Sequence, residues 1–476
     1  MARLRKNSLS PAVWFQRSRG RNLKKRVGEL NNKCSPENRI RTHDKHKTTV
    51  NDIWQKIKLI GKDAGLRKRV LFVLASLVVF RLLANIPIPA AAGSNLGNLF
   101  SNQALGFFNL LTGGGLSAVS IVMLGVGPYI TASIIMQLLT MMSERLKAIY
   151  HEEGEAGRRK FNRYSRLLTV PLAVFQGYGL LVFLERQGVI TGLSGFDFLL
   201  NIAIVVSGSV LLMWIGELMS EFGIGNGVSL IIFAGIVASL PSVVVQFVFT
   251  YIYPEFDPSI LPALLAFFAA AIVIIAGVVI VTEAERPIPI TYAKRVRGMK
   301  VYGGISTYLP IRVNQAGVIP IIFALSILIF PQVLVNFLSG SANEIVSGIF
   351  SVVGTVLNNV WFRSIFYFIL VFLFTYFYTA VTFDPEAIAE NLQKGGAFIP
   401  GVRPGKSTSE YIAKILGRVT FVGALFLGTI AVLPLVMQSL TDIQSFAIGG
   451  TALLIVVSVV LDLVKKIDAQ VSMREY

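Results

Sequence analysis

The sequence predicts an all-α membrane protein with ten transmembrane helices, arranged as two pseudo-symmetric five-helix halves of inverted orientation. The first observation is composition: 54% of the 476 residues are hydrophobic and only 15% are charged, with a mean hydropathy of +0.66. Soluble domains usually carry about 25% charged residues. The other two observations are the apolar runs along the chain and the alternation of basic residues between the loops that separate them.

Ten apolar runs are candidates for membrane spans, because a helix needs about 20 mostly apolar residues to cross the bilayer. The predicted spans are 70–86, 118–142, 167–184, 198–216, 228–250, 260–281, 316–338, 362–383, 415–434 and 444–464.

Loop charge gives the orientation of these spans. Loops 143–166, 282–315 and 384–414 are basic, whereas the alternate loops hold a single base, Arg186. This pattern fits the positive-inside rule with both termini cytoplasmic. One loop, 217–227, is predicted inside although it carries Glu217 and Glu221 and no base. Ten spans with both ends inside divide into two halves, 70–253 and 254–476, whose orientations are opposite, as in inverted repeats.

The amino-terminal region differs from the rest of the chain. Residues 1–48 contain 14 Lys or Arg and three acids, with no apolar stripe, which predicts disorder. They fit a cytoplasmic tail, an organelle transit peptide, or upstream sequence read from a wrongly chosen start. Residues 49–69 place Ile53, Trp54, Ile57 and Ile60 at helical spacing, which predicts a helix lying on the membrane surface.

Several function classes are disfavoured. The span interiors are nearly free of ionisable residues, with Arg81 as the main exception, which argues against the alternative of a small-solute secondary transporter. Gly405-Lys406-Ser407 ends like a phosphate-binding loop, but residue 400, which should be Gly, is Pro. The single Cys excludes an intramolecular disulfide and a Cys-based metal cluster. The three His lie in polar stretches of the sequence, so we expect no zinc site. We therefore expect no cofactor and no enzymatic activity.

Two glycine-rich segments are unusual at membrane depth. Span 118–142 contains Gly125, Gly127 and Pro128, which fit either a kinked packing helix or a pore-lining element. Segment 95–117 has three consecutive glycines, 113–115, near its end and is too short to span the bilayer. It fits either an external loop or a re-entrant segment with a glycine hinge.

From about residue 50 to 476 the chain resembles the SecY family, the channel subunits of bacterial and plastid protein translocases. The matching stretches are 127–139 (GPYITASIIMQLL), 153–160 (EGEAGRRK), 223–235 (GIGNGVSLIIFAG), 292–295 (YAKR), 313–320 (VNQAGVIP) and 401–405 (GVRPG). The resemblance implies a clamshell of two halves around an hourglass channel for unfolded, signal-bearing polypeptides, with hydrophobic segments released sideways into lipid.

The resemblance also implies site residues. An aliphatic ring at the narrowest point would consist of Val126, Ile130, Val228, Ile232, Ile322 and Ile455. A plug within 95–117 that seats against the ring would include Phe107, Phe108, Asn109, Leu110, Leu111, Gly113, Gly114 and Gly115. A lateral gate between the second and third spans and the seventh and eighth spans would carry Gln137 and Asn314.

Partners are implied in the same way. Lys294, Arg295, Arg297 and Arg403, on loops 282–315 and 384–414, would dock the ribosome and the SecA motor ATPase. Small SecE and SecG subunits, signal-bearing preproteins and membrane lipids are expected partners, and YidC and SecDF-type accessory proteins are further candidates. The implied location is a bacterial plasma membrane, with a plastid thylakoid membrane as the alternative.

Overall fold

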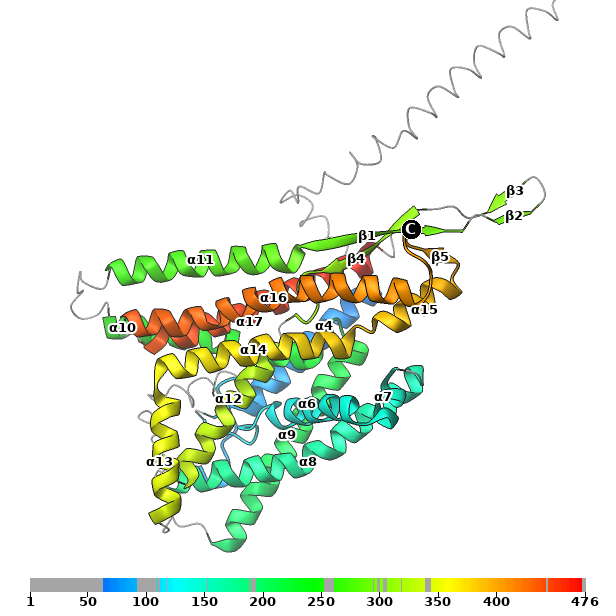
Figure 1. Ribbon diagram of the computed structural model, residues 1–476. Coiled ribbons are helices and arrows are strands. Elements are labelled where there is room, and N and C mark those ends of the chain that lie inside the picture. Colours follow the sequence, from blue (N-terminus) through cyan, green and yellow to red (C-terminus); the bar gives the residue numbers. More distant parts are fainter. Residues whose placement is uncertain are drawn as a thin grey trace, which may run out of the picture. The chain divides into compact units, whose positions relative to one another are not determined.

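The computed structural model (Figure 1) describes most of the chain from residue 63 onward. The described residues are 63–91, 109, 112–116, 118–151, 153–186, 188, 190, 194–251, 261–293, 295–297, 300–302, 306–317, 319–338, 344–441 and 444–472. The predictions for residues 1–48 and for most of 49–69 lie outside these residues. The chain divides into two units, Met1–Arg67 and Lys68–Tyr476, and nearly all of the described residues belong to the second unit.

One helix occurs at each of the ten predicted spans, which agrees with the predicted all-α membrane fold. In chain order these helices are α4 (Ala64–Ala84), α6 (Gly127–Met142), α8 (Gly154–Arg186), α9 (Gly195–Phe222), α10 (Gly227–Tyr251), α11 (Leu261–Glu283), α12 (Ile319–Leu338), α14 (Val360–Thr382), α16 (Lys406–Thr441) and α17 (Gln444–Ser472).

Length and apolar composition mark four stretches of the described chain as long enough to cross a membrane: Gly154–Glu185, Gly195–Phe222, Val360–Lys394 and Lys406–Ser439. Shorter apolar helical stretches are Gly127–Met142, Gly227–Pro241, Ala269–Glu283 and Ile319–Leu328. The inverted relation between the two halves stays a prediction.

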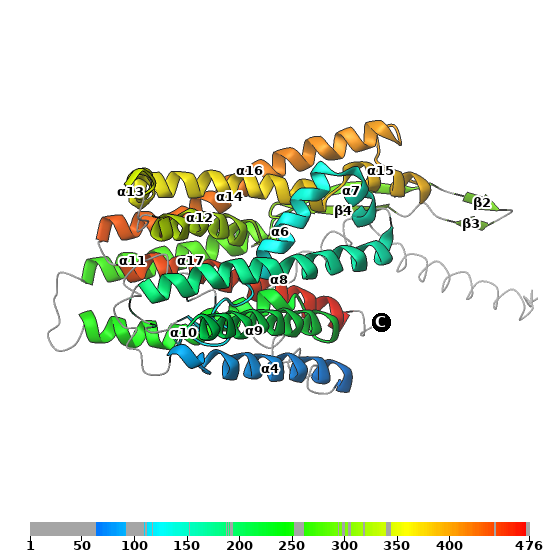
Figure 2. The same ribbon diagram turned by 90° about the horizontal axis from the view of Figure 1, so that it is seen from below.

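The helices of the second half pack through small residues and a few polar contacts. α14 and α16 lie side by side (Figures 1 and 2), and a Cβ on Gly428 of α16 would meet the ring of Phe368 at 2.8 Å. The missing side chain of Gly428 thus makes room for the Phe368 ring, and small residues of this kind let membrane helices pack closely without a hydrophobic driving force. α17 also pairs with α11, where Lys465 lies 3.0 Å from the Glu283 carboxylate.

Helix ends follow the capping residues in the sequence. Asn359 precedes α14, and its side-chain oxygen accepts hydrogen bonds from the backbone nitrogens of Trp361 and Phe362. Asp384 does the same for Glu386 and Ala387 at the start of α15 (Pro385–Lys394). These bonds satisfy backbone donors that have no partner within the helix.

Span 118–142 is shorter as a helix than predicted. Helix α6 begins only at Gly127, and residues 118–126 form successive turns. Gly125 has φ +58°, a left-handed conformation that helix residues do not adopt, so the helix cannot extend back through it. The buried turn residues nevertheless belong to the core, because Val122, Met123 and Leu124 are almost completely enclosed.

The two long basic loops contain strands, which an all-α prediction did not include. β1 (Glu285–Tyr292) pairs antiparallel with β4 (Ser306–Arg312) on one side and with β5 (Ala397–Phe398) on the other. β2 (Arg295–Arg297) and β3 (Lys300–Tyr302) form a separate hairpin. Ile288 and Ile311 of the three-stranded sheet are buried with Ile399 and Ile412, so both loops share one small core.

Two further short helices lie in segments predicted to be loops. α7 (Glu144–His151) falls within loop 143–166, and α13 (Glu344–Asn358) falls within loop 339–361. Neither is long enough to cross a bilayer at 1.5 Å per residue. They therefore leave the predicted number of spans unchanged.

Candidate functional site

The six residues of the predicted aliphatic ring all lie in or against one hydrophobic cluster. Four of them are buried members of the cluster: Val126, Ile232, Ile322 and Ile455, with exposed fractions of 2%, 1%, 6% and 0%. Ile130 and Val228 are partly buried and pack against it. Val126 directly precedes α6, and the other five lie on α6, α10, α12 and α17, so the six come from both predicted halves of the chain.

The predicted plug is only partly within the described residues. Asn109 and Gly113, Gly114 and Gly115 are described, whereas Phe107, Phe108, Leu110 and Leu111 lie outside that part of the chain. Gly113 and Gly114 both have positive φ, +71° and +81°, and so form a sharp turn. The Gly114 backbone nitrogen donates to the Asn109 carbonyl at 2.8 Å, which closes this turn.

The segment that follows the turn is fixed on two sides. On one side, the Ile88 nitrogen donates to the Val119 carbonyl and the Ile121 nitrogen donates to the Ile86 carbonyl, both at 2.9 Å. On the other side, the Ser209 hydroxyl of α9 donates to the Gly125 carbonyl at 2.9 Å. These bonds supply the backbone partners that a helix would otherwise provide at this depth.

The predicted gate residues differ in what they contact. Asn314 uses both ends of its amide within its own turn: its Oδ1 accepts from the Gly317 nitrogen at 2.9 Å, and its Nδ2 donates to the Gly317 carbonyl at 3.3 Å. The buried Oε1 of Gln137, on α6, has no hydrogen-bond partner among the described residues. α12 contacts both α6 and α8, so Gln137 lies on one of these contacting helices and Asn314 lies just before α12.

A neighbouring residue, Gln315, was not identified from sequence. Its Nε2 is buried and, within the described part of the chain, also lacks a partner. An unpaired buried amide costs about 1–3 kcal/mol. Gln315 directly follows Asn314 in the VNQAGVIP stretch, which is the signal that pointed to this segment.

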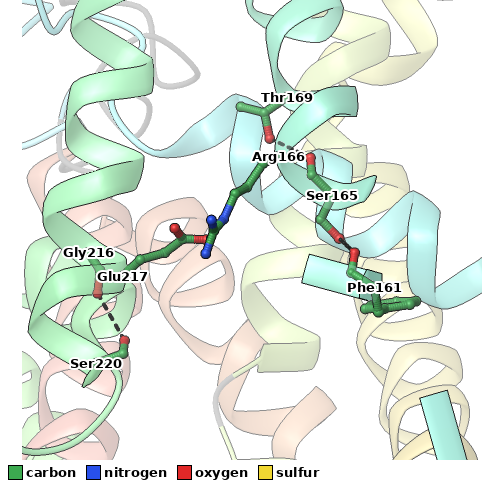
Figure 3. Close-up of polar contacts among 7 residues, drawn as sticks. All are labelled: Phe161, Ser165, Arg166, Thr169, Gly216, Glu217 and Ser220. Atoms are coloured by element: carbon green, nitrogen blue, oxygen red, sulfur yellow. Dashed lines mark hydrogen bonds and ion pairs between the residues drawn. The ribbon is translucent and has the colours of Figure 1, made fainter. Parts of the chain in front are cut away.

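An ion pair ties α8 to α9 in the first half. Figure 3 shows Arg166 reaching from α8 to Glu217 of α9, with Nε 2.7 Å from Oε1. The Tyr129 hydroxyl of α6 lies near the same carboxylate. Glu217 is one of the two acids of loop 217–227, and its partner Arg166 lies at the end of the basic loop 143–166. Nearby hydroxyls bond carbonyls of their own helices: Ser165 to Phe161, Thr169 to Ser165 and Ser220 to Gly216.

The predicted partner-binding residues lie on the strand-containing loops. Arg403 is exposed, and its carbonyl accepts a hydrogen bond from the Thr408 hydroxyl at 3.0 Å. Arg295 and Arg297 lie on β2, opposite Tyr302 and Lys300 of β3. Lys294 lies outside the described residues.

No group of three or more His, Cys, Asp or Glu suited to a metal ion occurs in the part of the chain that the structure describes.

These features define a polytopic helical membrane protein with a buried aliphatic cluster and a non-helical segment beside it. The fold is that of protein-conducting channels. It superposes with a TM-score of 0.57 on "The structure of a protein conducting channel", at 20% identity, covering 85% of this chain and 93% of the other. It also superposes with a TM-score of 0.52 on "Sec61 in the Canine ribosome-channel complex from the endoplasmic reticulum", at 18% identity, covering 85% and 93%.

The family is equally clear from sequence. Residues 120–464 match the SecY family model. The chain is 41% identical over 437 residues to "Protein translocase subunit SecY" of Thermotoga maritima, covering 89% of this chain and 97% of that protein. The subunit of the same name from Halalkalibacterium halodurans is 42% identical, with 89% and 99% covered. The chain belongs to the SecY family.

Proposed function

We propose that this protein is the channel subunit of a Sec-type translocase. It passes unfolded, signal-bearing polypeptides across the membrane and releases hydrophobic segments sideways into lipid. The observation that supports the proposal is that all six predicted ring residues lie in or against one buried hydrophobic cluster; they are Val126, before α6, and Ile130, Val228, Ile232, Ile322 and Ile455 on α6, α10, α12 and α17. Family membership supports the same function, since the relatives are named as translocase subunits.

An aliphatic ring explains how such a channel remains closed to ions. Branched hydrocarbon side chains offer no hydrogen bonds to water or ions, so a constriction made of them empties of water and blocks conduction. The same side chains yield to a passing peptide without binding it strongly. Two of the six are Val, whose side chain is smaller than that of Ile. This ring is therefore slightly wider than a ring of six Ile side chains would be.

The plug and the gate have separate tasks in this proposal. Segment 105–116, with Asn109 and the Gly113–Gly115 turn at its end, covers the ring from outside. The seam between α6 and α8 on one side and α12 and α14 on the other opens for a signal helix. Gln137 and Asn314, with Gln315, are the polar residues at the seam, and each polar contact across it would contribute about 1 kcal/mol.

The basic loops are the proposed docking surface for partners that supply energy. Arg295, Arg297 and Arg403, with Lys294, suit anionic partners such as ribosomal RNA or the acidic surface of the SecA motor. SecE and SecG are the proposed small subunits. Basic loops on one side support a plasma membrane location with both termini cytoplasmic. Both translocase relatives come from bacteria and match this chain over nearly their whole length, which supports a bacterial membrane.

Two experiments test the function. The first depletes the protein from its host. Export of signal-bearing proteins is then expected to stop, whereas normal export and normal membrane insertion would contradict the proposal. Saturable uptake of a small solute by vesicles that contain the purified protein would favour a secondary transporter instead.

The second experiment tests the ring. Ile455→Asn and Ile322→Asn each place an amide in the proposed seal, and we expect purified variants to leak ions more than the parent or to accept defective signals. Ile274→Asn is the matched control, because Ile274 of α11 is also a buried member of the cluster but lies outside the ring. If all three variants leak more than the parent and to the same extent, the leakage comes from a general loss of core packing and the ring assignment is wrong.

A further inference from the structure

Arg81 is an ionisable residue within a predicted span, and the proposed function gives it no role. It lies in the last turn of α4, the first span. Its Nη1 donates a hydrogen bond to the carbonyl oxygen of Gly113 at 2.8 Å, 32 residues further along the chain. A charged donor makes a stronger hydrogen bond than a neutral one. The bond therefore joins the end of the first span to the glycine turn of the plug segment.

Gly113 fits this position because it has no side chain. A Cβ at Gly113 would lie 2.5 Å from Cζ of Phe80, the neighbour of Arg81 on α4. It would also lie 3.0 Å from Cα of Gly235, on α10. The turn is therefore seated closely against two spans.

Hydrogen bonds attach the chain both before and after the Gly113–Gly114 turn. After the turn, the Ser120 nitrogen donates to the Gly115 carbonyl at 2.8 Å, and the bonds that join Val119 and Ile121 to residues 86–88 continue the attachment. Before the turn, the Thr112 hydroxyl and the Gly114 nitrogen both bond the carbonyl of Asn109. The Gly113–Gly114 turn, where Arg81 is bound, therefore lies between this attached chain and Asn109.

We propose that Arg81 is a positioning residue of the channel's closed state, which holds the Gly113–Gly114 turn against α4. Its bond to the Gly113 carbonyl breaks when the plug segment is displaced. Loss of this bond shifts the resting equilibrium toward the displaced arrangement. The inference rests on the proposed function, because the sealing role of the plug comes from there.

A simpler role for Arg81 is stabilisation of the end of α4. A cation in the last helical turn interacts favourably with the helix dipole. That role would lower the unfolding stability of an Arg81→Met variant without changing how well the folded channel holds ions. The two roles are therefore separated by measuring ion leakage and unfolding stability on the same samples.

The test measures ion efflux from liposomes that contain the full-length chain in its translocase complex, with no substrate present. Arg81→Met is expected to raise resting leakage about tenfold, which corresponds to about 1.4 kcal/mol in the closed-to-displaced equilibrium. The matched control is Arg69→Met, which removes the same charge from the exposed opposite end of α4 and is expected to leave leakage unchanged. Parent-like leakage of Arg81→Met, or equal leakage of both variants, would overturn the proposal.

A second pair of variants tests the turn without changing charge. Gly113→Ala is expected to raise leakage because its Cβ would overlap Phe80. Gly188→Ala is the control, since Gly188 has the same φ of +71° but nothing within 4 Å of its Cβ position, and its leakage should stay at the parent level. Parent-like leakage of Gly113→Ala would count against the closely seated turn and overturn the proposal.

Deletion of residues 105–111 separates this inference from the function on which it rests. A leaking deletion variant combined with a tight Arg81→Met variant would overturn the role of Arg81 and leave the sealing role of the plug intact. A deletion variant that leaks no more than the parent would overturn the sealing role of the plug, and the role of Arg81 with it.

Discussion

The ion pair between Arg166 and Glu217 is expected to stabilise the contact between two helices. It joins α8, a helix of the proposed gate, to α9, and the Tyr129 hydroxyl of α6 lies beside the same carboxylate. We predict that Arg166→Gln and Glu217→Gln each destabilise the protein, because each leaves the other charge without its partner at a partly enclosed helix interface.

The expected coupling energy follows from how exposed the two side chains are. Fully exposed ion pairs contribute about 0.2–1 kcal/mol, whereas breaking a buried pair costs about 3–5 kcal/mol. The Arg166 side chain is 47% exposed and that of Glu217 only 19%. This pair lies between the two limits, so we expect a coupling energy of about 1–2 kcal/mol from a double-mutant cycle.

The assay is unfolding by SDS in mixed micelles of the parent, both single variants and the double variant. The control cycle uses Asp462 and Lys466, an ion pair one turn apart on α17 whose side chains are 52% and 42% exposed. Its coupling should be only about 0.3–0.5 kcal/mol. Equal coupling energies in the two cycles, or none between Arg166 and Glu217, would refute the idea that this pair holds the gate helix to α9.

Two further predictions concern packing and capping. Gly208→Ala should cost at least about 2 kcal/mol of unfolding stability, because its Cβ would overlap the Ile121 carbonyl, whereas Gly179→Ala, with nothing nearby in the middle of α8, should be neutral or stabilising. Similar results for the two glycines in the same SDS titration would contradict this packing. Asn359→Ala should cost about 1 kcal/mol because it removes the cap of α14, while Asn359→Asp should retain most of the stability. An equal loss in both Asn359 variants would show that the cap is not what the side chain contributes.

The spans were predictable because a membrane imposes a simple rule on composition. Each apolar run contains one helix, but the ends were less certain. α8 begins at Gly154, well before the predicted start of the span at 167, because the polar segment that precedes the membrane continues the same helix. α6 begins later than predicted, because an apolar run does not reveal the left-handed backbone of Gly125.

Pairing between distant segments was the least predictable part. The alternation of Ile288 and Ile290 in loop 282–315 was a strand signal, but β5 is only two residues long and lies more than a hundred residues away. The partner of Glu217 was equally hidden, since Arg166 comes from another loop. The ring residues were assigned by family resemblance, and nothing in their own composition distinguishes them from other buried aliphatic residues. Their role, like that of the gate and docking residues, stays a prediction.

The three-stranded sheet has a mechanical consequence. β1 follows α11 almost directly, β4 leads toward α12, and β5 lies shortly before α16. A load applied to either of the two basic loops would therefore reach three helices at once, because the sheet joins the segments next to their ends. Helices α11, α12 and α16 would then move as one unit relative to the rest of the chain.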